Sequence, residues 1–184
     1  MRFFRCIACL AILFAARTSF AQEDCSIMLV ADGVDFSIFK AGAVNTDLTP
    51  LDPAGENEPS PGEEGLPTTN WTFEDFDASE WPIAPSGFGY GDRLDTLGTV
   101  LDDMEDSYVT VYLRHTFEIE DLAAISSLAI NMDYDDGFVA YINGTEVGRR
   151  NVDGTPPAFN TLAAGNHEST GTLELIPVLD IDSL

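Results

Sequence analysis

The side chains with the clearest capacity for chemistry lie in one acidic segment. Asp133, Asp135 and Asp136 place three carboxylates within four positions. A hard cation bound through oxygen would relieve their repulsion, so they could hold a structural calcium ion, and no other cofactor is expected. The spacing is not that of an EF-hand, because a glycine comes one step after Asp136. The alternative is a solvated acidic turn.

Arginine and aromatic side chains could bind a sugar. The planar fork of donors on Arg114 or Arg149 could grip a sugar hydroxyl or a carboxylate, although an ion pair with one of the 32 acids is the alternative. Trp71, Trp81 and Tyr90 could stack on a sugar ring, or they could cap a hydrophobic core.

Catalytic residues are not indicated. The histidines are His115 and His167, and the chain has no Gly-x-Ser-x-Gly motif, no metal-ligand histidine spacing and no phosphate-binding glycine loop. Carboxylates are too abundant for any pair of them to indicate glycoside cleavage. We therefore expect no enzymatic activity.

The N-terminus has the layout of a secretory signal peptide. A basic start is followed by an apolar run at 6–16 and by the small-residue site Ser19-Phe20-Ala21. The run is too short to span a bilayer, so residues 1–21 are expected to be removed and no membrane insertion is expected. The protein is expected to be secreted or extracellular, with the periplasm and the cell surface as variants.

The charge excludes some partners. The formal net charge is −24, and removing Arg2, Arg5 and Arg17 would leave five basic against 32 acidic side chains, a charge of −27. Nucleic acid and anionic membrane surfaces would be repelled.

Apolar periodicity of two predicts strands. Alternation is clearest at 108–118, where Val111, Leu113 and Phe117 share one face, and it resumes at 128–132. Two short strands are expected within 26–40, with a turn at Asp32-Gly33. The segment 41–70 is rich in proline, glycine and acids and is expected to be a surface loop, and 71–92 is expected to be an irregular aromatic loop.

A β-hairpin is predicted at Asn143-Gly144, because both central residues of a type I′ turn need positive φ. The strands and tight turns predict one all-β domain, an antiparallel β-sandwich over residues 22–184. Its core is expected to contain Val111, Leu113, Phe117, Leu128, Ile130, Phe138 and Ile142.

Three blocks of residues resemble a known family. They are Trp71…Phe76-Asp77-x-Ser79-x-Trp81…Gly87-Phe88-Gly89-Tyr90-Gly91-Asp92, then Tyr112-Leu113-Arg114-x-x-Phe117, then Asp135-Asp136-Gly137-x-x-x-Tyr141-x-Asn143-Gly144-x-Glu146-Val147-x-Arg149-x-Asn151. This order resembles galactose-binding-like jelly-roll modules of large secreted bacterial proteins. The segment 163–168 is similar to the loop that follows in such modules.

The resemblance implies a jelly roll, and it favours two functions. One is a non-catalytic carbohydrate-binding or surface-attachment module of a larger secreted protein. The other is a structural accessory domain that packs against an adjoining domain or partner protein, without a small ligand. Candidate ligand-binding residues are Trp81, Tyr90, Asp92, Arg114, Arg149, Asn151, His167 and Glu168.

The resemblance also predicts a strand after the apolar stretch 174–179 that this sequence does not contain. We therefore expect a sandwich that lacks its last strand, with a gap in strand pairing beside 108–117 or 138–142.

Overall fold

The computed structural model describes residues 4–9, 13–18, 26–28, 33–43, 71–91, 94–105, 108–119, 121–158 and 161–181. Strands dominate these residues, and the helical elements among them are two short 3-10 turns, η1 (Leu94–Thr96) and η2 (Leu122–Ala124). Asp121 caps η2 by accepting a hydrogen bond from the Ala123 N–H. None of the described helical segments is long and apolar enough to cross a membrane.

The larger sheet has six strands in the order β11-β10-β1-β8-β4-β5, and every neighbouring pair is antiparallel. Its longest strand is β8. The strands are β1 (Phe4–Cys9), β4 (Asp35–Ala43), β5 (Ile83–Pro85), β8 (Tyr108–Ile119), β10 (Phe138–Ile142) and β11 (Thr145–Arg150).

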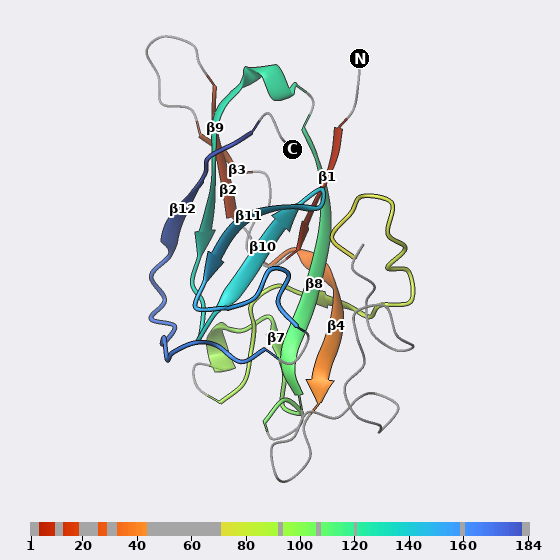
Figure 1. Cartoon of the computed structure of the whole chain (residues 1–184), viewed down its shortest axis with the longest axis vertical. Coiled ribbons are helices and arrows are strands. Elements are labelled where there is room, and N and C mark those ends of the chain that lie inside the picture. Colours follow the sequence, from red (N-terminus) through yellow and green to blue (C-terminus); the bar gives the residue numbers. More distant parts are fainter. Residues whose placement is uncertain are drawn as a thin grey trace.

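The smaller sheet has four antiparallel strands in the order β12-β9-β2-β3 and lies against the larger one (Figure 1). Its strands are β2 (Leu13–Thr18), β3 (Ser26–Met28), β9 (Ile125–Met132) and β12 (Glu174–Val178). Two short strands, β6 (Phe88–Gly89) and β7 (Thr99–Val100), pair in parallel outside these sheets.

The core fills the space between the two sheets. Six of the seven residues expected there are buried, and Val111 is partly buried against them. The buried core is completed by further side chains of β4, β8, β9, β10 and β12 and by Leu101. Its members are Phe36, Ile38, Leu101, Leu113, Phe117, Ile119, Leu128, Ile130, Met132, Phe138, Ala140, Ile142, Ile176 and Val178. The chain is therefore an all-β sandwich, as its period-two pattern predicts.

The β10–β11 hairpin forms at the predicted turn. Asn143 and Gly144 have φ values of 47° and 86°, and Ile142 pairs with Thr145 across the turn. The register shifts between Ala140 and Tyr141, where β11 carries an additional residue. The Gly144 N–H also donates to the carbonyl of Thr72 at 3.0 Å, so the turn holds the start of the aromatic loop.

Two expectations about loops are wrong in part. Residues 41–43, expected in the surface loop, continue β4, because Ala41 and Ala43 pair with Thr110 and Tyr108 of the long strand β8. The rest of the expected loop, 44–70, lies outside the described residues. The expected irregular loop 71–92 contains β5 and β6, and the parallel β6–β7 pair departs from a purely antiparallel fold.

The expected gap in strand pairing is occupied in this structure. β1 pairs with β8 on one side and with β10 on the other. β2 likewise lies between β9 and β3. Both β1 and β2 belong to residues 1–21, which are expected to be removed as a signal peptide. The gap in strand pairing is therefore an expectation for the chain without these residues.

Gly144→Ala tests the turn. An alanine there would have to keep a positive φ, and its Cβ would displace the ring of Phe73. We expect the free energy of unfolding to fall by about 1–2 kcal/mol in urea denaturation. Gly165→Ala is the matched control, since its Cβ would meet nothing within 4 Å, and it should stay within about 0.5 kcal/mol of the parent. Equal effects of the two changes would contradict the turn assignment.

Candidate functional site

Some of the candidate ligand-binding residues gather in two regions of the sandwich. Trp81 and Arg114 lie together over the outer face of the larger sheet, where the segment 71–81 crosses it. Asp136, Asn151 and His167 meet where the loops 133–137 and 166–171 come together. Neither region holds all the residues that the sequence nominates.

Six rings form an aromatic cluster over β4, β8 and β10. Trp71 contacts Tyr112 and Tyr141 edge-on, with ring centroids 4.7 and 5.8 Å apart. Trp81 packs on Phe39 at 5.3 Å and on Phe76 at 5.5 Å. The members are Phe39, Trp71, Phe76, Trp81, Tyr112 and Tyr141. Trp81 is only 9% exposed, so the face of its indole is used in packing rather than offered to a sugar ring.

Arg114 joins the segment 71–76 to β8. It is 5% exposed, and its guanidinium donates to the carbonyls of Trp71, Phe73 and Phe76, the last two at 3.0 and 3.3 Å. Its Cζ also lies 4.9 Å from the centroid of the Phe76 ring. The donors proposed for a sugar are thus directed at backbone carbonyls of the chain itself.

Burial in the aromatic cluster also changes the acidity of a tyrosine. Desolvation, helped by the neighbouring Tyr141, raises the pKa of Tyr112 to about 12. A tyrosine buried in this way stays neutral where a solvated one would ionise, because its charged form loses hydration.

The carboxylate of Asp133 organises the loop 166–171. It accepts hydrogen bonds from the Ser169 hydroxyl at 2.8 Å and from the backbone N–H groups of Thr170 and Gly171 at 3.1 and 2.8 Å. Such a carboxylate is already supplied with donors, and it joins the loop 166–171 to the residue that follows β9.

Asp136, Asn151 and His167 hold the two loops together. The Asp136 N–H donates to the His167 carbonyl at 2.7 Å, and the His167 N–H donates to Asp136 Oδ1 at 3.3 Å. Asn151 Nδ2 donates to the Asp136 carbonyl at 3.0 Å. The imidazole of His167 stacks on Tyr134, with centroids 4.0 Å apart and planes 10° apart, and its Nδ1 lies 2.9 Å from the Tyr134 carbonyl oxygen.

These contacts bear on the calcium hypothesis. Asp133 points to the loop 166–171, whereas Asp135 and Asp136 are exposed. In the parts of the chain that the structure describes, no three His, Cys, Asp or Glu side chains gather in a way that could hold a metal ion. Calcium binding by these carboxylates remains a prediction, which titration of the protein with calcium would test.

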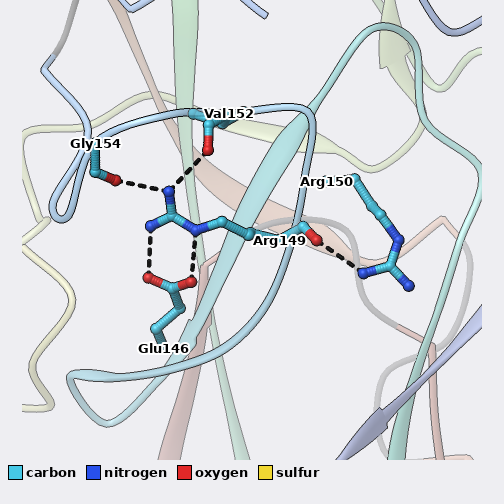
Figure 2. Close-up of polar contacts among 5 residues, drawn as sticks. All are labelled: Glu146, Arg149, Arg150, Val152 and Gly154. Atoms are coloured by element: carbon cyan, nitrogen blue, oxygen red, sulfur yellow. Dashed lines mark hydrogen bonds and ion pairs between the residues drawn. The ribbon is translucent and has the colours of Figure 1, made fainter. Parts of the chain in front are cut away.

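The Arg149 side chain donates four hydrogen bonds to groups of the chain itself (Figure 2). Its Nε and Nη2 donate to the two carboxylate oxygens of Glu146, both at 2.7 Å, and its Nη1 donates to the carbonyls of Val152 and Gly154. The Glu146 hydrogen bonds raise the pKa of Arg149 above its usual value. Arg150 turns away and pairs with Glu174 at 2.5 Å, which links β11 to β12 across the edge of the sandwich.

The remaining candidates are more open. Tyr90 is 46% exposed, and Glu168 is exposed. Asp92 lies outside the described residues. Tyr90 is therefore the candidate aromatic residue whose ring is accessible.

One surface feature was not predicted from the sequence. The outward positions of β12 and its flanks are apolar and exposed: Leu173, Leu175, Pro177 and Leu179. Between them, Ile176 and Val178 point into the core. The signal was present as a strand segment apolar on both faces, in a sandwich whose outer face should be polar. We call these four residues the β12 row.

Comparison with protein-family models, with curated proteins and with solved structures finds no match to this chain. The class that the structure defines is therefore an all-β, mainly antiparallel sandwich. The contacts above show a set of polar side chains engaged with the chain's own backbone and carboxylates.

Arg114→Lys tests the anchoring of the segment 71–76. A lysine ammonium lacks the planar fork and cannot serve all three carbonyls, so the free energy of unfolding should fall by about 1–3 kcal/mol. Tryptophan emission should shift to the red as Trp71 becomes hydrated. Arg149→Lys is the matched control, because that side chain is more exposed and its loss should cost less than about 1 kcal/mol. An unshifted spectrum for Arg114→Lys would contradict the anchoring role.

Tyr112→Phe tests the aromatic cluster by its pH dependence. The folded-state pKa of Tyr112 is raised, so its stabilisation is complete below the unfolded value near 10 and is lost as pH rises toward 12. At pH 11 this loss amounts to about 1 kcal/mol. Urea denaturation at pH 8 and pH 11 should show a smaller decline for the variant than for the parent. Identical declines would mean that Tyr112 ionises freely in the folded chain.

Proposed function

We propose that this chain is a non-catalytic extracellular accessory module that packs against an adjoining domain or partner protein through the β12 row. The observation that carries the proposal is this row of exposed apolar side chains on the outer face of an edge strand and its two flanking residues. Single exposed apolar residues are ordinary, but a contiguous strip of them is typical of a protein contact.

The polar candidates support the same function. Arg114, Asp133, Asn151, His167 and Arg149 are directed at groups within the chain. A sugar site needs donors and acceptors that converge on open space beside an accessible ring. Their engagement favours the accessory module over the carbohydrate-binding module.

Charge narrows the choice of partner. A second copy of a chain with net charge −24 would be repelled, so self-association through the β12 row is disfavoured. A neutral or basic protein surface with its own apolar centre would complement it.

Site-specific photocrosslinking tests this function. A photoreactive leucine analogue at 175 should crosslink to one protein or domain, whereas the analogue at exposed Leu162 should not. With the purified partner, Leu175→Ser should raise Kd about tenfold or more, whereas Leu162→Ser should leave it unchanged. Equal Kd values for the two variants would rule out the β12 row as the contact.

Carbohydrate binding is the second candidate, and the accessible ring of Tyr90 favours it. A glycan array and affinity electrophoresis should show saturable binding that Tyr90→Ala abolishes. Tyr90 is the informative position, because replacing the buried Trp81 would also disturb the aromatic cluster. Silence on the array with intact folding would support the accessory module instead.

A further inference from the structure

The turn of the β10–β11 hairpin carries a chemically reactive pair of residues. Asn143 is the one asparagine of the sequence that a glycine follows. The backbone nitrogen of the residue after an asparagine can attack its side-chain carbonyl carbon, which forms a cyclic imide and expels the side-chain amide as ammonia. A following glycine favours this attack, because it has no side chain to obstruct it and its backbone rotates freely. Asn143-Gly144 is therefore the position of the sequence most prone to deamidation.

The folded chain engages the attacking nitrogen. The Gly144 N–H donates to the carbonyl of Thr72 at 3.0 Å. The nitrogen becomes a nucleophile only when a base removes this proton, and the hydrogen bond withholds the proton from the solvent. The ring of Phe73 also covers the glycine, since a Cβ built there would overlap the ring. While these contacts hold, formation of the imide is suppressed.

Arg114 decides whether this protection holds. Thr72 is 5% exposed and lies in the segment 71–76, and the guanidinium of Arg114 donates to the backbone carbonyls on either side of it. If the segment lifts, the Thr72 carbonyl and the Phe73 ring leave the turn together. Such a local opening does not require the core between the sheets to unfold.

We propose that Asn143 is a modification site, at which deamidation proceeds when the segment 71–76 lifts from the hairpin turn. In the opened chain the Gly144 nitrogen loses its proton to a solvent base and bonds to Cγ of Asn143. The Cγ–Nδ2 bond breaks, and the amide leaves as ammonia. Water then opens the imide at either carbonyl, which gives aspartate or isoaspartate. Isoaspartate adds a methylene to the main chain of the turn, so the type I′ geometry and the hydrogen bond to Thr72 are lost.

Peptide mapping by mass spectrometry follows the loss of the Asn143 amide in the full chain at neutral pH. Arg114→Lys loosens the segment 71–76, and Phe73→Ala uncovers the turn at a residue that is 47% exposed. Val178→Ala is the matched control. It removes buried volume from β12 and lowers the stability of the whole sandwich, but it leaves the Arg114 contacts in place.

The pair Asp136-Gly137 is a control within the same chain. An Asp-Gly pair forms the same imide by loss of water, and this glycine N–H donates to the carbonyl of Asp135 at 2.8 Å rather than to the segment 71–76. Isoaspartate at Asp136, detected by enzymatic methylation of the mapped peptide, should form at the same rate in the parent and in Arg114→Lys.

The expected result is that Arg114→Lys and Phe73→Ala each raise the rate of amide loss at Asn143 at least about tenfold, whereas Val178→Ala stays within about twofold of the parent. Equal acceleration by Val178→Ala would overturn the proposal, because deamidation would then follow global unfolding. A parent that deamidates as fast as the chain in urea would overturn it as well. If Arg114→Lys does not fold, an unchanged rate in Phe73→Ala would do so.

Asn143→Asp separates the added charge from the altered main chain. This variant keeps the length of the turn, so its tryptophan emission should match that of the parent, while the isolated isoaspartate form should be shifted to the red as Trp71 becomes hydrated. An isoaspartate form with the emission of the parent would overturn the coupling between the turn and the segment 71–76.

Discussion

Arg114 brings a positive charge to a place that water hardly reaches, on the face of β8 away from the core. Burial of an unpaired cation is among the largest costs a fold can carry, so its guanidinium must be supplied with acceptors. The carbonyls of Trp71, Phe73 and Phe76 meet that need. The segment 71–76 is thereby fixed over the sheet. This places the ring of Trp71 against Tyr112 and the ring of Phe76 against Trp81.

Lys40, Arg149 and Arg150 are also bound to acceptors within the chain. Lys40 pairs with both carboxylate oxygens of Asp103 at 2.7 Å, and Tyr108 donates to the same carboxylate at 2.7 Å. The Lys40 and Tyr108 hydrogen bonds lower the pKa of Asp103. Arg149 and Arg150 pair with Glu146 and Glu174. Lys40, Arg114 and Arg150 thus each fasten one segment to another, and Arg149 fastens the end of β11 to the turn that follows it.

Local pattern was enough to predict the middle of the fold. Strands β8 to β11 follow from period-two alternation and from Asn143-Gly144, because both signals lie within a few residues. The order of strands could not be predicted, since β8 pairs with β1 and β4, which are distant in sequence. Whether Trp81 and Arg114 pack within the chain or face a ligand was left open by the sequence for a related reason. It depends on how 71–81 crosses the sheet, and the residue types alone suit a binding site equally well.

The position of β1 has a consequence for the timing of synthesis. Phe4–Cys9 is made well before its pairing partners in β8 and β10, which begin about a hundred residues later in the chain. At roughly 5–20 residues per second, synthesis leaves this segment without its partners for several seconds or more. The distance along the chain therefore leaves the backbone groups of β1 without these partners during synthesis, until β8 and β10 have been made.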